Sequence, residues 1–264
     1  MENNIINQKT IRVLEKYKRE NSKISIYLKE LNGKTLMGYN ETLKVNSASC
    51  IKVPIMLAIL RQVELKKIKL EDIINFENYN LPDYEDIYSE KEKKASILEL
   101  LTFMIINSDN LATNVLIDLF GFDYFNNFFK ELNLNSTSLN RYMEIYNLNK
   151  ENYTSNDDMY NTYKKIYNDE ILNKDLCSIA RNILHKQRGK KASQRYIYQD
   201  IEVYHKTGGL EYLQLKNDCG YFRQNNKAYY FGYFAQGLKS KNEAEIMIGE
   251  MFDVFYKYIL ENNN

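Results

Sequence analysis

A serine and a lysine separated by two residues precede a long apolar segment, in NSASCIKVPIM at residues 46–56. If a helix begins here, Ser49 and Lys52 lie on one face of its first turn, where the helix N-terminus also stabilises developing negative charge. An amine held beside a hydroxyl can take its proton and make the oxygen a nucleophile. Taken alone, the spacing is better explained by a helix-capping serine followed by a solvent-exposed lysine.

Two further short motifs have the same double interpretation. The first is SDN at residues 108–110, and the second is HKTGG at residues 205–209. Serine, aspartate and asparagine are all favoured at helix N-caps, and a glycine pair suits a turn at the end of a strand. Each motif taken singly therefore indicates ordinary local structure.

The elements around the motifs place them in three different contexts. Apolar residues recur at helical spacing from Ile97 to Ile105 and again from Ala112 to Leu119, and Gly121 can end the second helix. The SDN motif then lies in the loop between two helices. KTG follows a strand pattern in IEVYHKTGG, and SxxK stands at a helix start.

The rest of the chain predicts a sheet with a helix at each end. A helix over residues 5–20 precedes a β-hairpin made of KISIYLKEL and TLMGY, with Asn32-Gly33 in its turn. Residues from Ser49 to about 195 predict a block of helices. The last third predicts the strands IEVYHKTGG, CGYFR and AYYFGYFA, with an Asn225-Asn226 turn, and a final helix over 243–260.

SxxK, SDN and KTG in this order and in these contexts resemble the penicillin-recognising serine hydrolases, most closely the class A β-lactamases. The resemblance extends over nearly the whole chain. It implies an α+β fold in which an antiparallel five-stranded sheet, flanked by helices, packs beside an all-helical lobe. We expect residues 1–52 and 197–264 to form the sheet lobe and 53–196 the helical lobe, as one intertwined catalytic unit with the site between them.

The resemblance also implies a role for each motif residue. Ser49 would be the acylated nucleophile, Lys52 its base, and Ser108 the group that passes the proton to the leaving nitrogen. Asn110 would hold Lys52 and contact the substrate amide. Two further functions follow from the third motif: Lys206 and Thr207 would bind a substrate carboxylate, and the backbone N–H groups of Ser49 and Gly209 would form the oxyanion hole. No metal or cofactor is implied.

One segment departs from the family pattern, LNRYMEIYNLNKENYTSNDDM at residues 139–159. Class A enzymes hydrolyse the acyl-enzyme with a glutamate that directly follows an arginine-aromatic pair. Aligning Arg141-Tyr142 puts Met143 at that position and moves Glu144 one residue along. Glu144 is therefore the candidate deacylating base, provided that the loop bends it back toward Ser49. Otherwise the site lacks a base, and deacylation is impaired.

The same loop leaves two other positions open. Asn152 falls where the family has the aspartate that pairs with the arginine, so the sequence predicts a loop without that ion pair. Asn147 or Asn149 is a candidate for the family's water-holding asparagine.

The resemblance predicts hydrolysis of a β-lactam, or of a similar carboxylate-bearing amide, through an acyl-enzyme. Two alternatives remain open. One is a D-amino-acid peptidase or esterase of the same fold, and the other is a β-lactam-binding or sensor protein that acylates slowly.

Composition limits the partners. The chain has 264 residues, and Lys+Arg number 36 against 35 Asp+Glu. This balance favours a small-molecule substrate over nucleic acid or an anionic membrane, and we expect a monomer. Three cysteines without metal-ligand spacing predict neither a zinc site nor a disulfide framework. The N-terminal residues lack a signal-peptide pattern, so we expect a cytoplasmic protein if the chain is complete and a secreted or cell-envelope protein if a signal was removed.

Three polar positions outside the motifs are assigned to ordinary structure. His185 is expected at the surface, and His205 is expected to be packed or at a sheet edge rather than catalytic. Cys50 is expected to be a small buried side chain. The run at residues 187–195 is predicted to be a solvated loop.

Overall fold

A computed structural model describes residues 2–77, 93–144, 150–189 and 192–262. Within these ranges no helix combines the length and the apolar character that crossing a membrane would need.

The first half of the described chain contains α1 (Glu2–Tyr17), β1 (Lys23–Glu30), β2 (Thr35–Tyr39), β3 (Val45–Asn46), the 3₁₀ turn η1 (Ala48–Ile51), α2 (Lys52–Glu64), β4 (Ile73–Asn75), β5 (Lys94–Ser96), α3 (Ile97–Ile106), α4 (Asn110–Phe120) and α5 (Phe122–Glu131). The second half contains β6 (Tyr153–Thr154), α6 (Asn156–Tyr167), α7 (Lys174–His185), η2 (Ser193–Tyr196), β7 (Val203–Leu210), η3 (Glu211–Leu213), β8 (Leu215–Gln224), β9 (Lys227–Gln236) and α8 (Lys241–Asn262).

The predicted five-stranded antiparallel sheet is confirmed. The N-terminal hairpin joins the three late strands in the order β2-β1-β9-β8-β7, so strands from the two ends of the chain pair along β1 and β9. The turn between β8 and β9 has Asn225 and Asn226 at φ 49° and 61°. Asparagine tolerates this left-handed backbone, which suits a tight hairpin.

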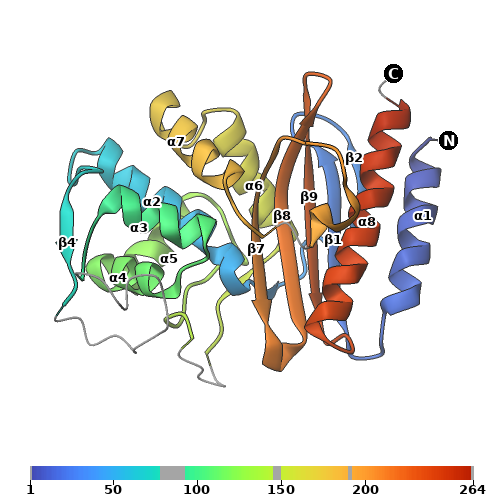
Figure 1. Ribbon diagram of the computed structural model, residues 1–264, viewed down its shortest axis with the longest axis horizontal. Coiled ribbons are helices and arrows are strands. Elements are labelled where there is room, and N and C mark those ends of the chain that lie inside the picture. The colour runs from blue at the N-terminus through green and yellow to red at the C-terminus, as the bar shows by residue number, and fades with distance from the viewer. Residues whose placement is uncertain (1, 78–92, 145–149, 190–191, 263–264) are drawn as a thin grey trace.

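Two apolar cores lie on opposite faces of the sheet. Alternate residues of β9 divide between them: Tyr229, Phe231 and Tyr233 pack under α1 and α8, while Tyr230 and Phe234 face the helical region. Figure 1 shows α1 and α8 side by side on one face, with α6 against the other face and α2 to α5 beyond it. The sheet is therefore covered on both faces, as its nearly continuous burial requires.

The helical region begins and ends its helices largely where the residue pattern predicts. The Ser96 hydroxyl accepts from the Glu99 N–H, and the Glu99 carboxylate accepts from the Ser96 N–H, so a capping box opens α3. Gly121, at φ 77°, ends α4. Two short ladders, β3 with β6 and β4 with β5, interrupt the block that the sequence predicts to be helical. Strands of two or three residues are too short to leave an alternating pattern.

The prediction of a solvated loop over 187–195 is wrong for two of its polar residues, although Arg195 is exposed. The side chains of Gln187 and Ser193 are 4% and 0% exposed. Both residues are polar and therefore read as surface, but each contacts a buried partner: Gln187 bonds to Thr207, and the Ser193 N–H donates to Asp218 at 3.0 Å.

Candidate active site

Ser49 lies in the turn between a short strand and the long buried helix α2. Ala48, directly before it, has a left-handed backbone with φ 42°, and its N–H donates to the side-chain carbonyl of Asn46 at 3.0 Å. This turn leaves Ser49 half-buried, while Cys50 and Ile51, the last two residues before α2, are fully buried. Strained backbone of this kind is typical of residues held for function.

The Lys52 amine is buried and directed at the SDN loop. Its Nζ donates to the backbone carbonyl of Ser108 at 2.7 Å and to the Asn110 Oδ1 at 2.7 Å. The Ser108 hydroxyl lies 3.4 Å from the same nitrogen. A buried amine that is fixed by oxygen acceptors has a defined position rather than the mobility of a surface lysine.

The SDN loop divides its three residues between two tasks. Asp109 caps α4, because its carboxylate accepts from the Ala112 N–H at 2.7 Å. Ser108 has φ 60°, a conformation that is uncommon for serine, and the Ser108 and Asn110 side chains contact Lys52. The capping interpretation therefore holds for the aspartate, while its two neighbours face the site.

Lys206 reaches the same hydroxyl from β7. Its Nζ lies 3.0 Å from Ser108 Oγ and donates to the Thr207 carbonyl at 2.8 Å. The side chain is fully buried, and this burial lowers the pKa of Lys206 to about 8. Ser108 Oγ is thus within hydrogen-bond reach of two amines, which is the arrangement needed to pass a proton.

Thr207 is oriented by a residue that the sequence analysis did not select. The Gln187 Oε1 accepts from the Gly189 N–H at 2.7 Å, which fixes the amide so that its Nε2 donates to Thr207 Oγ1 at 3.2 Å. A hydroxyl that already accepts one bond keeps its own proton to donate. Thr207 can therefore donate toward a bound carboxylate.

Two glycines follow Thr207 and differ in what they contact. A Cβ on Gly208 would lie 2.8 Å from the backbone nitrogen of Ser49, so only glycine permits this close approach of β7 to the turn that contains Ser49. Gly209 lines the same cavity as Ser49. This open cavity, of about 70 Å³, is lined by Ala48, Ser49, Asn110, Arg141, Met143, Glu144, Asn152, Gly209 and Leu210.

Glu144 returns to the site although it stands one residue late. Its backbone has φ 60°, and its Oε1 accepts from the Asn110 Nδ2 at 2.5 Å. Met143, at the family's glutamate position, is 5% exposed and packs in the core. Asn114 holds its backbone, because the Met143 N–H donates to Asn114 Oδ1 at 2.7 Å and Asn114 Nδ2 donates to the Met143 carbonyl at 3.2 Å. The left-handed backbone at Glu144 therefore lets its carboxylate reach Asn110 despite the one-residue shift.

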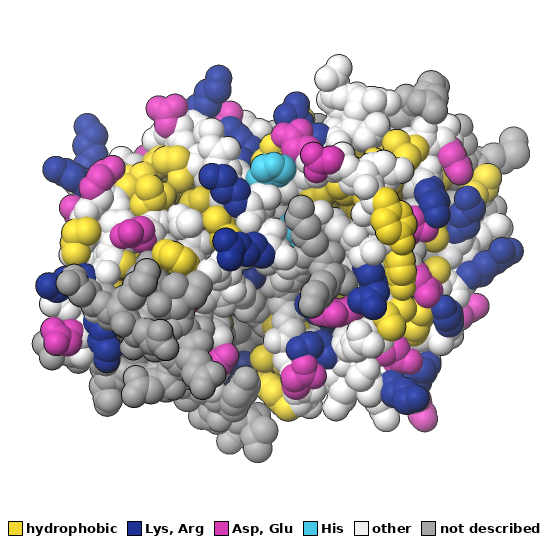
Figure 2. Space-filling model, in the orientation of Figure 1, with side chains coloured by type: hydrophobic (Ala, Val, Ile, Leu, Met, Phe, Trp, Pro, Cys, Tyr) yellow, Lys and Arg dark blue, Asp and Glu magenta, His cyan; other side chains and the backbone are white. Residues whose placement is uncertain are grey.

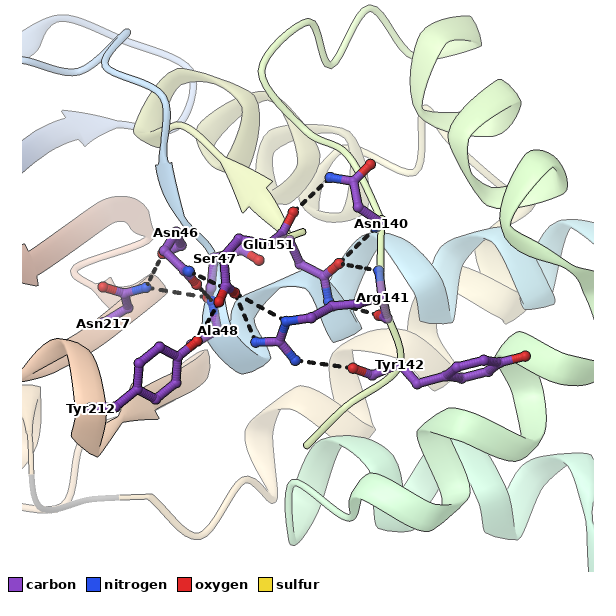
Figure 3. Close-up of polar contacts among 10 residues, drawn as sticks. Asn46, Ser47, Ala48, Asn140, Arg141, Tyr142, Glu151, Tyr212 and Asn217 are labelled. Carbon is purple, nitrogen blue, oxygen red and sulfur yellow. Dashed lines mark hydrogen bonds and ion pairs between the residues drawn. The ribbon is translucent and has the colours of Figure 1, made fainter. Parts of the chain in front are cut away.

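The expectation of a loop without an arginine-acid pair is wrong. The Arg141 guanidinium is buried and bonds to Glu151 Oε2 through Nη2 at 2.8 Å and Nε at 3.1 Å (Figure 3). Asn152 instead bridges the backbone of Arg141, accepting from its N–H and donating to its carbonyl, both at 3.1 Å. The acid that pairs with the arginine has moved one residue earlier. Asn147 and Asn149 lie outside the described residues.

The missed residues differ in how visible they are in the sequence. Glu151 could have been found, because a buried arginine needs a carboxylate and Glu151 is adjacent to the position that the family fills with one. Gln187 and Asn114 give no such signal. Each is an isolated polar residue in the sequence, and only its contacts in the folded structure show that it belongs to the site.

The two histidines lie away from the cavity. His205 alternates with Lys206 along β7, so its ring faces the α8 side, where Nδ1 lies 2.8 Å from Asp218 Oδ1 with both side chains buried. His185 is exposed and its Nδ1 lies 3.1 Å from the Val203 carbonyl oxygen. Cys50 is buried, and its thiol donates to the Lys206 carbonyl at 3.3 Å.

A hydroxyl, two amines and a carboxylate lie close together in this site. Ser49 borders a cavity, two amines converge on the Ser108 hydroxyl, and a carboxylate lies at the same cavity. Figure 2 shows acidic and basic side chains interspersed over the visible face of the described residues, with no broad field of one sign there. Selection of a charged substrate would then depend on local groups such as Lys206.

Comparisons with known proteins identify the family and the fold. A model of the β-lactamase enzyme family matches residues 7–259. No curated protein is significantly similar in sequence. A β-lactamase from Sphaerobacter thermophilus DSM 20745 superposes with a TM-score of 0.87 at 22% identity, covering 95% of this chain and 96% of that one. A class A β-lactamase from Bacteroides cellulosilyticus DSM 14838 gives 0.86 at 19% identity, covering 99% of both chains.

A third solved structure is a PBP-A mutant with a leucine replaced by glutamate, in an acyl-enzyme complex with penicillin G. It superposes with a TM-score of 0.85 at 22% identity, covering 98% of this chain and 97% of that one. At these identities the superpositions establish the fold, while the family match spans almost the entire sequence. The chain belongs to the β-lactamase enzyme family and is a serine hydrolase of the β-lactamase type.

Proposed function

We propose that this enzyme opens β-lactams, or similar amides that bear a carboxylate, through an acyl-enzyme on Ser49. The single observation that carries the proposal is the position of Ser108 Oγ, 3.4 Å from Lys52 Nζ and 3.0 Å from Lys206 Nζ, beside the cavity that Ser49 borders. Those contacts support a path for the proton from Lys52 through Ser108 to the leaving nitrogen, and a cation, Lys206, for the carboxylate.

Acylation would proceed in two proton transfers. Lys52, in its neutral form, takes the Ser49 proton as Oγ attacks the amide carbonyl, and the N–H groups of Ser49 and Gly209 stabilise the oxyanion. The amide C–N bond then breaks, and the leaving nitrogen takes the Ser108 proton while Ser108 regains one from Lys52. Asn110 keeps Lys52 in place through the 2.7 Å contact with its Oδ1.

Lys206 and Thr207 would bind the substrate carboxylate. A protonated amine and a hydroxyl donor give two charge-assisted hydrogen bonds to one carboxylate. Gln187 supports this role, because its amide occupies one acceptor position of Thr207 Oγ1 and leaves the proton for the ligand.

Deacylation would use Glu144 as the base that activates water. Its support is the shared cavity with Ser49 and the 2.5 Å contact with Asn110. The same contact also favours a second candidate function, a slowly deacylating β-lactam-binding protein, since one carboxylate oxygen of Glu144 is already occupied by the Asn110 amide. A D-amino-acid peptidase or esterase of the same fold is the third candidate.

Intact-protein mass spectrometry after mixing with penicillin G would separate these candidates. We expect a mass increase equal to one penicillin that decays as product forms, and no increase in Ser49→Ala. Ser136→Ala, outside the cavity, is the matched control and should label like the native enzyme. A persistent adduct would identify the slow-deacylating protein. Labelling of Ser49→Ala would exclude Ser49 as the nucleophile.

A further inference from the structure

We propose that the hydrogen bond between Tyr212 and Glu151 is a clasp across the cavity that sets how bulky an acyl group Ser49 accepts. The proposal rests on the proposed function for the identity of the acylated serine. It concerns two residues outside the three catalytic motifs.

Glu151 binds three segments that are distant in the sequence. Its Oε2 accepts from Arg141 and also from Asn46 Nδ2 at 2.9 Å, while its Oε1 accepts from the Tyr212 hydroxyl. Figure 3 shows Tyr212 extending from its turn toward the carboxylate and the guanidinium. One partly buried carboxylate therefore joins the loop before β6, the strand before the nucleophile and the turn η3 after β7.

The protonation states keep the clasp closed near neutral pH. Burial opposes ionisation of Glu151, but the hydrogen bonds from Tyr212, Asn46 and Arg141 outweigh it and lower its pKa. Burial and the neighbouring carboxylate raise the pKa of Tyr212 to about 12, so its hydroxyl remains a donor. A neutral donor and a charged acceptor make one of the stronger hydrogen bonds.

The two ends of the clasp are fixed to opposite walls of the cavity. Arg141, which is ion-paired with Glu151, and Asn152, the next residue in the sequence, line one wall. Gly209 and Leu210, directly before η3, line the other. The Tyr212 hydroxyl bond thus limits how far these walls can separate. The distance between the walls then limits the size of the acyl side chain that can enter between them.

The contact of Glu151 with Asn46 determines which residue should be mutated to test the clasp. Asn46 donates to Glu151 and accepts from the Ala48 N–H, directly before Ser49. Replacing Glu151 would therefore disturb the walls and the nucleophile together. Tyr212→Phe removes only the oxygen that joins the walls, and it leaves the Arg141 and Asn46 contacts of Glu151 in place.

The decisive experiment compares kcat/KM of native enzyme and Tyr212→Phe on two p-nitrophenyl esters, one of acetic acid and one of a bulky branched acid. Two penicillins with one nucleus and side chains of different size form a parallel pair. We expect the bulky-to-small ratio to rise about tenfold in Tyr212→Phe, the scale at which pocket size discriminates substrates. Tyr198→Phe, with a ring that is 91% exposed, is the control and should leave the ratio unchanged.

Amide hydrogen exchange tests the clasp without any substrate. Tyr212→Phe should speed exchange in residues 150–154 and 211–215 together, while Tyr198→Phe should not. An unchanged ester ratio would overturn the role in selectivity, and unchanged exchange would overturn the clasp. If penicillins fail to acylate the native enzyme but esters succeed, the proposed substrate is wrong, and the ester ratio still tests the role of the clasp in selectivity. If no ester acylates Ser49, hydrogen exchange alone tests whether the clasp holds the two segments together.

Discussion

The side-chain amide of Asn110 bridges Lys52 and Glu144, accepting from the Lys52 amine at 2.7 Å and donating to the Glu144 carboxylate at 2.5 Å. One asparagine thus connects the group assigned to acylation with the group assigned to deacylation. The contact depends on the left-handed backbone of Glu144, at φ 60°, which turns the carboxylate toward the site.

We expect Glu144→Gln to leave the acylation burst intact and to slow decay of the acyl-enzyme about a hundred- to ten-thousand-fold, the usual loss when a positioned general base is removed. Glutamine keeps the size and the contact with Asn110 but cannot accept the proton from water. Quenched-flow mass spectrometry with penicillin G measures both phases.

The control for that experiment is Met143→Leu. This swap conserves volume in a buried position, so turnover should persist. Native turnover that is unaffected by Glu144→Gln would contradict the assignment of the base.

Substrate capture should weaken with rising pH, because protonated Lys206 is the form that attracts a carboxylate. Burial lowers the pKa of Lys206 to about 8, so kcat/KM for a carboxylate substrate should fall as pH rises through that value. The methyl ester of the same substrate lacks the charge and should lose little over this range. The measurement is a pair of pH profiles, and identical profiles for acid and ester would show that Lys206 does not bind the carboxylate.

Gln187→Glu should raise KM for the free acid about tenfold or more, with a much smaller effect on its ester. A carboxylate at this position would accept a hydrogen bond from the Thr207 hydroxyl, which could then no longer donate to the substrate. Its negative charge would also repel the substrate carboxylate. Gln187→Met, of similar length, removes the bond without adding charge and should fall between native and Gln187→Glu. Equal changes on acid and ester would indicate general damage to the site.

Gly208→Ala should lower the acylation rate about a hundredfold, since an added Cβ would lie 2.8 Å from the Ser49 backbone nitrogen and displace the nucleophile. Gly209→Ala should cost less, because its nearest contact, Lys241 Cδ at 3.1 Å, belongs to a flexible, half-buried side chain rather than to the backbone. Stopped-flow acylation of both variants gives the comparison. A larger loss of acylation rate in Gly209→Ala than in Gly208→Ala would contradict the assignment of Gly208 as the residue that permits the close approach to Ser49.

Much of the framework could be predicted because it depends on local patterns. Helical spacing from Ile97 to Ile105, strand alternation in KISIYLKEL and an Asn-Asn turn specify elements without reference to distant residues. The order of SxxK, SDN and KTG then placed Ser49, Ser108 and Lys206 on three elements of one family fold. The helix-capping role of Asp109 was equally visible in the sequence.

The sequence by itself determined the elements and the family, whereas the tertiary structure decided which contacts Glu144, Glu151, Gln187 and Tyr212 make. Whether Glu144 returned depended on a left-handed backbone at a residue that is not glycine, which residue types do not encode. The partner of Arg141 shifted by one residue because an ion pair needs only the right position in space. Gln187 and Tyr212 acquired their contacts when segments 20 and 61 residues apart packed together, since hydrogen bonds of this kind depend on the folded chain rather than on sequence spacing.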